Sequence, residues 1–99
     1  MSLPSNQPQV QLHQTADFRE SYANSVQIRL SLWDFFLTFG TVTQNSPDVV
    51  NVNVFQGIYL SPQQAKALAA LLEQNIAHYE ATFGEIHLEA RAPNSGVVQ

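Results

Sequence analysis

The apolar and polar positions of residues 22–40 alternate in the pattern of β-strands. In the first segment the even positions from Val26 to Leu32 are apolar, and the positions between them are polar. A period of two predicts a strand with one face in water. In the second segment the odd positions 35–39 are apolar and share one face, and Phe36 lies on the other face. Because only a short connection separates the segments, we predict a hairpin.

A third alternating segment follows the turn-forming residues 41–48, which include Pro47 and Asp48. Valines occupy every second position from 50 to 54, and the same parity continues to Leu60. Gly57 interrupts the pattern and is predicted to mark a bulge. The segment therefore predicts a strand of up to ~10 residues, which is near the upper end for globular proteins.

The helix signal after residue 60 is the strongest in the chain. Ser61 suits the N-cap, Pro62 the first helical position and Gln64 a capping box, and Gly84 is a natural residue to follow the last turn. The apolar stripe at helical spacing, hereafter the Leu72 stripe, consists of Ala65, Leu68, Ala69, Leu72, Ile76, Tyr79 and Phe83. A second, smaller stripe consists of Ala67, Ala70, Leu71, Ala77 and Ala81. One sheet can cover only one side of a helix, so the second stripe predicts contact with another copy.

These segments predict an α+β domain, an antiparallel meander of three to four strands with one long C-terminal helix packed on one face. The order is β-β-β-α, with a short final strand near residues 86–91 as an option. We predict a flexible N-terminal arm at residues 1–19, a single domain at 20–91 and a disordered tail at 92–99. Sequential hairpins favour this meander.

Composition narrows the classes of function. Charged residues make up 12% of the 99 residues, about half the usual share, and a surface poor in charge protects little against self-association. The net charge is −4 and the four basic residues are scattered, which argues against binding to duplex nucleic acid. The absence of cysteine excludes disulfides and thiolate sites and favours a reducing, cytoplasmic location. We find no signal peptide and no membrane span, and expect no membrane partner.

The middle of the chain resembles a family of short prokaryotic proteins catalogued as a domain of unknown function, number three-four-six-seven. The matching pieces are Tyr22-Ala23-Asn24, Asp34-Phe35 with Phe39-Gly40, Leu60-Ser61-Pro62 with Ala65-Lys66, and Tyr79-Glu80 followed by Phe83-Gly84-Glu85-Ile86. They span residues 22–86, and the arms outside that span are unmatched. The resemblance implies a bacterial or archaeal origin and a compact domain, and it supplies no activity, substrate or site.

No residue cluster predicts a catalytic, cofactor or metal site. His13, His78 and His87 lack the spacing of metal ligands, and a zinc site needs three or four convergent side chains. Asp34 stands among aromatic residues and could act as an acid or base, but a turn carboxylate that accepts backbone N–H groups is the favoured interpretation. Glu80 and Glu85 lie near the helix C-terminus, where negative charge interacts unfavourably with the helix dipole. They therefore either pair with a positively charged partner or are simply solvated.

Surplus apolar surface predicts a partner, with a homodimer favoured and another protein as an option. The interface candidates are Trp33, Phe36, Phe55, Tyr59, Ala67, Ala70, Leu71 and Ala77. The preferred function is a non-catalytic, homo-oligomeric interaction or adaptor protein. One alternative is a regulator that stacks single-stranded nucleic acid on the aromatic residues of the open sheet face. A second alternative is a small enzyme with a dimer-interface site around Asp34, Glu80 or His78. The N-terminal arm could also cover the aromatic face.

Overall fold

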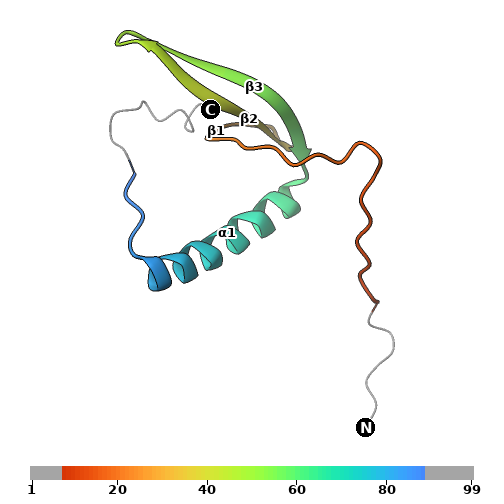
Figure 1. The fold of residues 1–99 in the computed structure, drawn as a ribbon. Helices are drawn as coiled ribbons and strands as arrows, with labels where there is room; N and C mark the ends of the chain where they lie inside the picture. Colours follow the sequence, from red (N-terminus) through yellow and green to blue (C-terminus); the bar gives the residue numbers. More distant parts are fainter. Residues whose placement is uncertain (1–7, 89–99) are drawn as a thin grey trace.

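The computed structural model describes residues 8–88 and shows a three-stranded sheet followed by one helix (Figure 1). The elements are β1 (Ser25–Leu30), β2 (Phe35–Ser46), β3 (Val49–Leu60) and α1 (Pro62–Phe83). The strands pair antiparallel in the order β1-β2-β3, which confirms the predicted β-β-β-α meander. Residues 84–88 form no strand, and the remainder of the optional final strand and the tail lie outside the described residues.

The β1–β2 hairpin is closed by the hydroxyl group of Ser31. Its Oγ atom accepts the backbone N–H groups of Trp33 at 3.0 Å and Asp34 at 3.2 Å. The backbone N–H of Ser31 donates to the carbonyl of Asp34 at 2.9 Å. A serine hydroxyl commonly replaces a backbone partner in this way, so the sequence folds a tight turn here without glycine or proline.

Asn24 extends the β1–β2 pairing by one step beyond the strand. Its backbone N–H donates to the carbonyl of Gly40 at 3.0 Å, and its side-chain Oδ1 accepts the N–H of Val42 at 2.8 Å. The side chain thus supplies an acceptor for β2 where β1 no longer does. This contact gives a physical role to a residue of the Tyr22-Ala23-Asn24 motif.

A bulge at Phe55 divides the long β2–β3 hairpin. Phe39 pairs with Gln56 and Gly40 pairs with Val54, so Phe55 is an extra residue on β3. Gly40 permits the bulge because a Cβ atom there would lie 2.6 Å from the carbonyl oxygen of Asn53. The prediction of a bulge at Gly57 is therefore wrong, since Gly57 pairs regularly with Thr38.

The bulge changes which side chains share a face. The Leu37 face, as we name it, carries Val26, Ile28, Leu30, Phe35, Leu37, Phe39, Ile58 and Leu60. The opposite Phe36 face carries Gln27, Arg29, Phe36, Thr38, Gly57 and Tyr59. Beyond the bulge, Val52 pairs with Val42 and Val54 with Gly40, so these valines lie on the Phe36 face. The expectation that they continue the Leu37 face fails because the extra residue inverts the parity of β3.

α1 begins and ends where the sequence predicts, and of the predicted capping box only the hydrogen bond to the Ser61 hydroxyl forms. The Ser61 hydroxyl accepts the N–H of Gln64 at 3.1 Å, and Pro62 occupies the first turn. Gly84 has a φ of 111° and donates its N–H to the carbonyl of Glu80 at 3.0 Å. A positive φ favours glycine, so this residue ends the helix.

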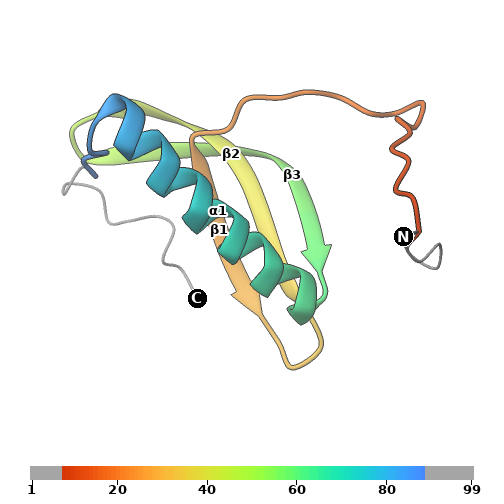
Figure 2. The ribbon, with the colours of Figure 1, turned by 90° about the horizontal axis from the view of Figure 1, so that it is seen from below.

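The helix covers less of the sheet than predicted. α1 leaves the end of β3 and runs back beneath the sheet while diverging from it (Figures 1 and 2). None of its residues is buried, and its apolar residues from Ala69 onward are exposed. Among the described residues, the buried hydrophobic core consists of Leu37 alone, at 8% exposure. The radius of gyration is 17.9 Å, against about 13 Å for a compact domain of this length.

Candidate interaction surfaces

The Leu72 stripe of α1 is an apolar surface that the sheet leaves largely uncovered. Ile76 is 45% exposed and Phe83 is 72% exposed, and Leu72 and Tyr79 lie between these values. Near the C-terminal end, the rings of Tyr79 and Phe83 pack together with their centroids 5.0 Å apart. The exposure of the stripe increases along the helix: Ala65 and Leu68 in the first turns are half-buried, and the members from Ala69 onward are exposed.

The Phe36 face carries a three-layer stack of side chains. The rings of Phe36 and Tyr59 stack with their centroids 4.3 Å apart, and the guanidinium carbon of Arg29 lies 4.7 Å from the Phe36 centroid. Cross-strand pairing places these residues side by side on adjacent strands. The Phe36 ring also lies over Gly57, where a Cβ atom would meet it at 2.8 Å. The glycine thus gives the ring room to lie flat.

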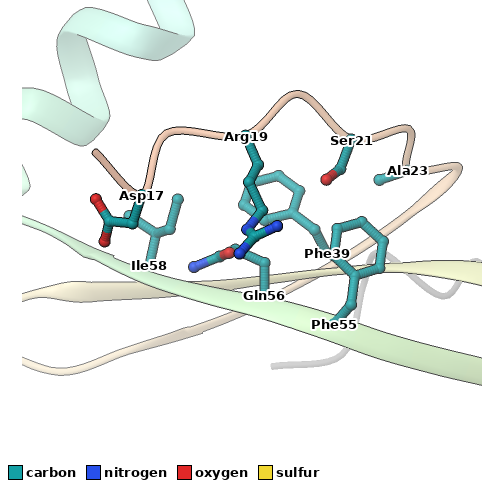
Figure 3. Close-up of a pocket in the computed structure, with 8 residues that line it drawn as sticks. All are labelled: Asp17, Arg19, Ser21, Ala23, Phe39, Phe55, Gln56 and Ile58. Atoms are coloured by element: carbon teal, nitrogen blue, oxygen red, sulfur yellow. The ribbon is translucent and has the colours of Figure 1, made fainter. Parts of the chain in front are cut away.

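The opposite, Leu37 face carries a cavity of about 550 Å³ beneath the N-terminal segment (Figure 3). Side chains of β2 and β3 rise from the sheet towards the segment, and Arg19 reaches down to them. The lining residues are Asp17, Arg19, Ser21 and Ala23 from the segment and Phe39, Phe55, Gln56 and Ile58 from the sheet. The cavity therefore has a mixed lining, in which Phe39, Phe55 and Ile58 of the sheet are apolar, and Gln56 of the sheet and Asp17, Arg19 and Ser21 of the segment are polar.

Asp17 at the rim is held by its neighbour Thr15. The Thr15 hydroxyl donates to the Asp17 carboxylate at 2.6 Å. This hydrogen bond, with a smaller contribution from the backbone of Asp17, lowers the pKa of the carboxyl group. The rim thus keeps one negative charge beside the positive charge of Arg19 at neutral pH.

The predicted interface residues do not form one patch. Phe36 and Tyr59 share the stack, but Phe55 lines the cavity on the opposite face because of the bulge. Trp33 lies in the β1–β2 turn and is 77% exposed. The helical candidates Ala67, Ala70, Leu71 and Ala77 are all exposed. The N-terminal segment covers part of the Leu37 face instead of the Phe36 face.

Sequence reasoning had not singled out Arg19 and Ala23, which line the cavity, or Arg29, which lies over the Phe36 ring. The alternation of the first strand places Arg29 on its polar face. The pairing of this strand with β2 could therefore have predicted the contact between Arg29 and Phe36. The cavity depends on where the N-terminal segment crosses the sheet, and the segment lacks periodic residues that signal this position.

The carboxylates weighed as catalytic groups have local structural partners. The Asp34 carboxylate accepts the Ser31 hydroxyl at 3.4 Å, so the turn role is carried mainly by Ser31. The Glu80 carboxylate accepts the backbone N–H of Ile86 at 3.0 Å and so fixes the chain after α1. Within residues 8–88 no three His, Asp or Glu side chains gather as metal ligands. No helix in that range is long and apolar enough to cross a membrane.

Comparison with known families gives one match. A family model described as a protein of unknown function, DUF3467, matches residues 1–88. The match includes the N-terminal segment, which the motifs in the sequence had left outside the resemblance. Comparison with curated proteins and with solved structures found no match. On the family match, which covers most of the chain, this protein belongs to the DUF3467 family.

Proposed function

We propose that this protein is a non-catalytic, cytoplasmic interaction protein that works as a homodimer. The observation that carries the proposal is α1, a helix of 22 residues without a buried residue. An isolated helix in water draws little stability from propensity, and in proteins most helical stability comes from packing an apolar face. A second copy that covers the Leu72 stripe supplies this packing.

The surface area of the chain supports a partner of substantial size. The accessible surface is 8882 Å², whereas a compact monomer of 11.0 kDa exposes about 5,600 Å². Part of the excess of about 3,300 Å² belongs to the N-terminal segment. Obligate homodimers bury about 2,000–5,000 Å² in total from the two chains. The area that each chain would bury in such a dimer is therefore smaller than the excess surface of that chain.

Burial of the Leu72 stripe alone would contribute considerably to the free energy of dimerisation. Full burial of a leucine or isoleucine side chain contributes about 1.5–3 kcal/mol, and roughly half of that remains to be gained for a half-exposed side chain. Leu72, Ile76 and Tyr79 are each about half exposed. The low share of charged residues, 12%, further supports association because it leaves little charge to repel another copy.

A charge placed in the Leu72 stripe tests the proposal. Ile76→Glu is expected to weaken dimerisation at least tenfold, because dimerisation would bury a carboxylate among apolar side chains. Gln74→Glu adds the same charge to the opposite side of the helix, within the second stripe of Ala67, Ala70, Leu71, Ala77 and Ala81. It is expected to leave a dimer through the Leu72 stripe intact, and it would weaken a dimer through the second stripe instead. Size-exclusion chromatography with light scattering over a range of concentrations measures both. Equal masses for the two variants would contradict a dimer through this stripe.

A second candidate function is binding of single-stranded nucleic acid. The stack of Arg29, Phe36 and Tyr59 favours it, since bases stack on aromatic rings and on guanidinium groups. Fluorescence anisotropy with short single strands at low salt tests this candidate, with Tyr59→Ala as the variant expected to lose binding. Absence of binding by the unaltered protein at low salt would exclude it.

A further inference from the structure

We propose that the Tyr79–Phe83 pair of one copy inserts into the cavity beneath residues 17–23 of a second copy. The inference rests on the proposed homodimer and adds the contact that orders it. It assigns the cavity an occupant, the aromatic end of a partner helix. It also assigns the N-terminal segment a role, because that segment forms the roof of the cavity (Figure 3).

The cavity has the properties of a receptor for aromatic side chains. Phe39, Phe55 and Ile58 provide the apolar floor, and the volume is about 550 Å³. The bulge is what brings Phe55 to this face beside Phe39. Aromatic side chains bury about 150–250 Å² each and pack well against other aromatic rings.

The helix end has the properties of the matching ligand. Tyr79 and Phe83 are already packed against each other in a tilted arrangement, so little side-chain freedom is left to lose on insertion. Phe83 is the most exposed residue of the pair. Large aromatic residues that are preorganised and exposed are typical anchors of protein interfaces.

The helix end is acidic, whereas the rim of the cavity carries one positive and one negative side chain. The C-terminal half of α1 carries Glu73 and Glu80, and Glu85 follows it, whereas the last turn has no basic residue. The rim of the cavity presents Arg19. Asp17 at the same rim opposes this attraction, because the hydrogen bond from Thr15 lowers the pKa of its carboxyl group and so favours the negative charge. An exposed pair of this kind contributes about 0–1 kcal/mol, so it orients the contact more than it drives it.

The chain's own helix does not fill its own cavity. α1 contacts the sheet at its first turns, beside the end of β3, and a helix of 22 residues places its other end about 33 Å away. No residue of α1 lines the cavity. The occupant from this protein is therefore a helix of another copy.

Cysteine cross-linking tests the contact directly, because the chain has no native cysteine. Ser21→Cys marks the rim of the cavity, and Thr82→Cys marks the helix end while leaving both aromatic side chains in place. We expect a mixture of these variants to form a disulfide-linked heterodimer under mild oxidation. Ser21→Cys mixed with Gln74→Cys is the matched control, and we expect at least tenfold less cross-linked product from it.

A second measurement does not depend on a cysteine. Phe83→Ala is expected to raise the dimer Kd at least tenfold, whereas Phe18→Ala, which truncates an exposed phenylalanine that does not line the cavity, is expected to leave it unchanged. A dimer that forms without the cross-link between positions 21 and 82 and is insensitive to Phe83→Ala would overturn this inference and leave the proposed function standing. A monomer at all concentrations would overturn both.

Discussion

Gly40 provides the sharpest test of the hairpin geometry. A Cβ atom at this position would lie 2.6 Å from the carbonyl oxygen of Asn53 and 3.1 Å from the Cα atom of Val54. Both obstacles are backbone atoms of β3, so they cannot rotate away as a side chain can. Gly40→Ala therefore forces the paired strands apart at the bulge.

The expected cost follows from the rigidity of the obstacle. Overpacking costs about 1–3 kcal/mol, and we expect the upper half of this range for Gly40→Ala. One kcal/mol shifts the Tm of a domain of this size by about 4–8 °C, so Tm should fall by roughly 10–20 °C. Urea unfolding followed by far-ultraviolet circular dichroism measures the same loss. All samples need one protein concentration, because dimerisation makes the apparent stability concentration-dependent.

Gly57→Ala is the matched control. Its Cβ atom would meet the Phe36 ring at 2.8 Å, but this ring is the movable end of a side chain. We expect a smaller loss of stability than for Gly40→Ala, together with disruption of the stack with Tyr59. The account of the bulge would be refuted if Gly40→Ala lost less than about 0.5 kcal/mol, the usual range for neutral surface substitutions, or less than Gly57→Ala.

Substitutions at three further positions test local contacts. Asn24→Ala should cost about 1 kcal/mol in urea unfolding because it removes the acceptor for the Val42 N–H, and Asn24→Asp, which keeps an acceptor, should cost less; equal losses would count against this bond. Ser61→Ala should cost about 1 kcal/mol by removing the N-cap, and unchanged helix content and stability would argue against it. Thr15→Ala should raise the pKa of Asp17 measured by NMR titration. Because the folded pKa is lowered, the stabilisation is present above the unfolded pKa and lost as pH falls through the folded value; an unchanged pKa would exclude the hydrogen bond as its cause.

Local signals in the sequence predicted most of the fold. The helix ends depend on residues within one turn of each boundary, such as Ser61 and Gly84, and they form as predicted. β1 and the first half of β2 likewise follow from alternation, because β1 and β2 pair without a register shift. The prediction of a turn at residues 41–48 is wrong for its first part, since β2 continues to Ser46 and pairs with β3 there.

The remaining features depend on pairs that are distant in sequence. The bulge at Phe55 arises where Gly40 lets a neighbouring backbone approach, so the alternation within β3 could not reveal it. The position of Phe55 on the Leu37 face follows from that bulge. The cavity likewise requires the path of residues 17–23 over the sheet, which no local pattern specifies. The divergence of α1 from the sheet was not predicted either, because the sequence indicated that the sheet would cover one of the two apolar stripes.

Sedimentation equilibrium at micromolar concentrations tests the central claim most directly. The claim is that the helix and the sheet face of one chain need a second copy to cover them. The account predicts a mass of twice 11.0 kDa that dissociates only on strong dilution. A mass of 11.0 kDa throughout the range, with α1 fully helical, would show that the chain is stable with its apolar stripe in water and would contradict the account.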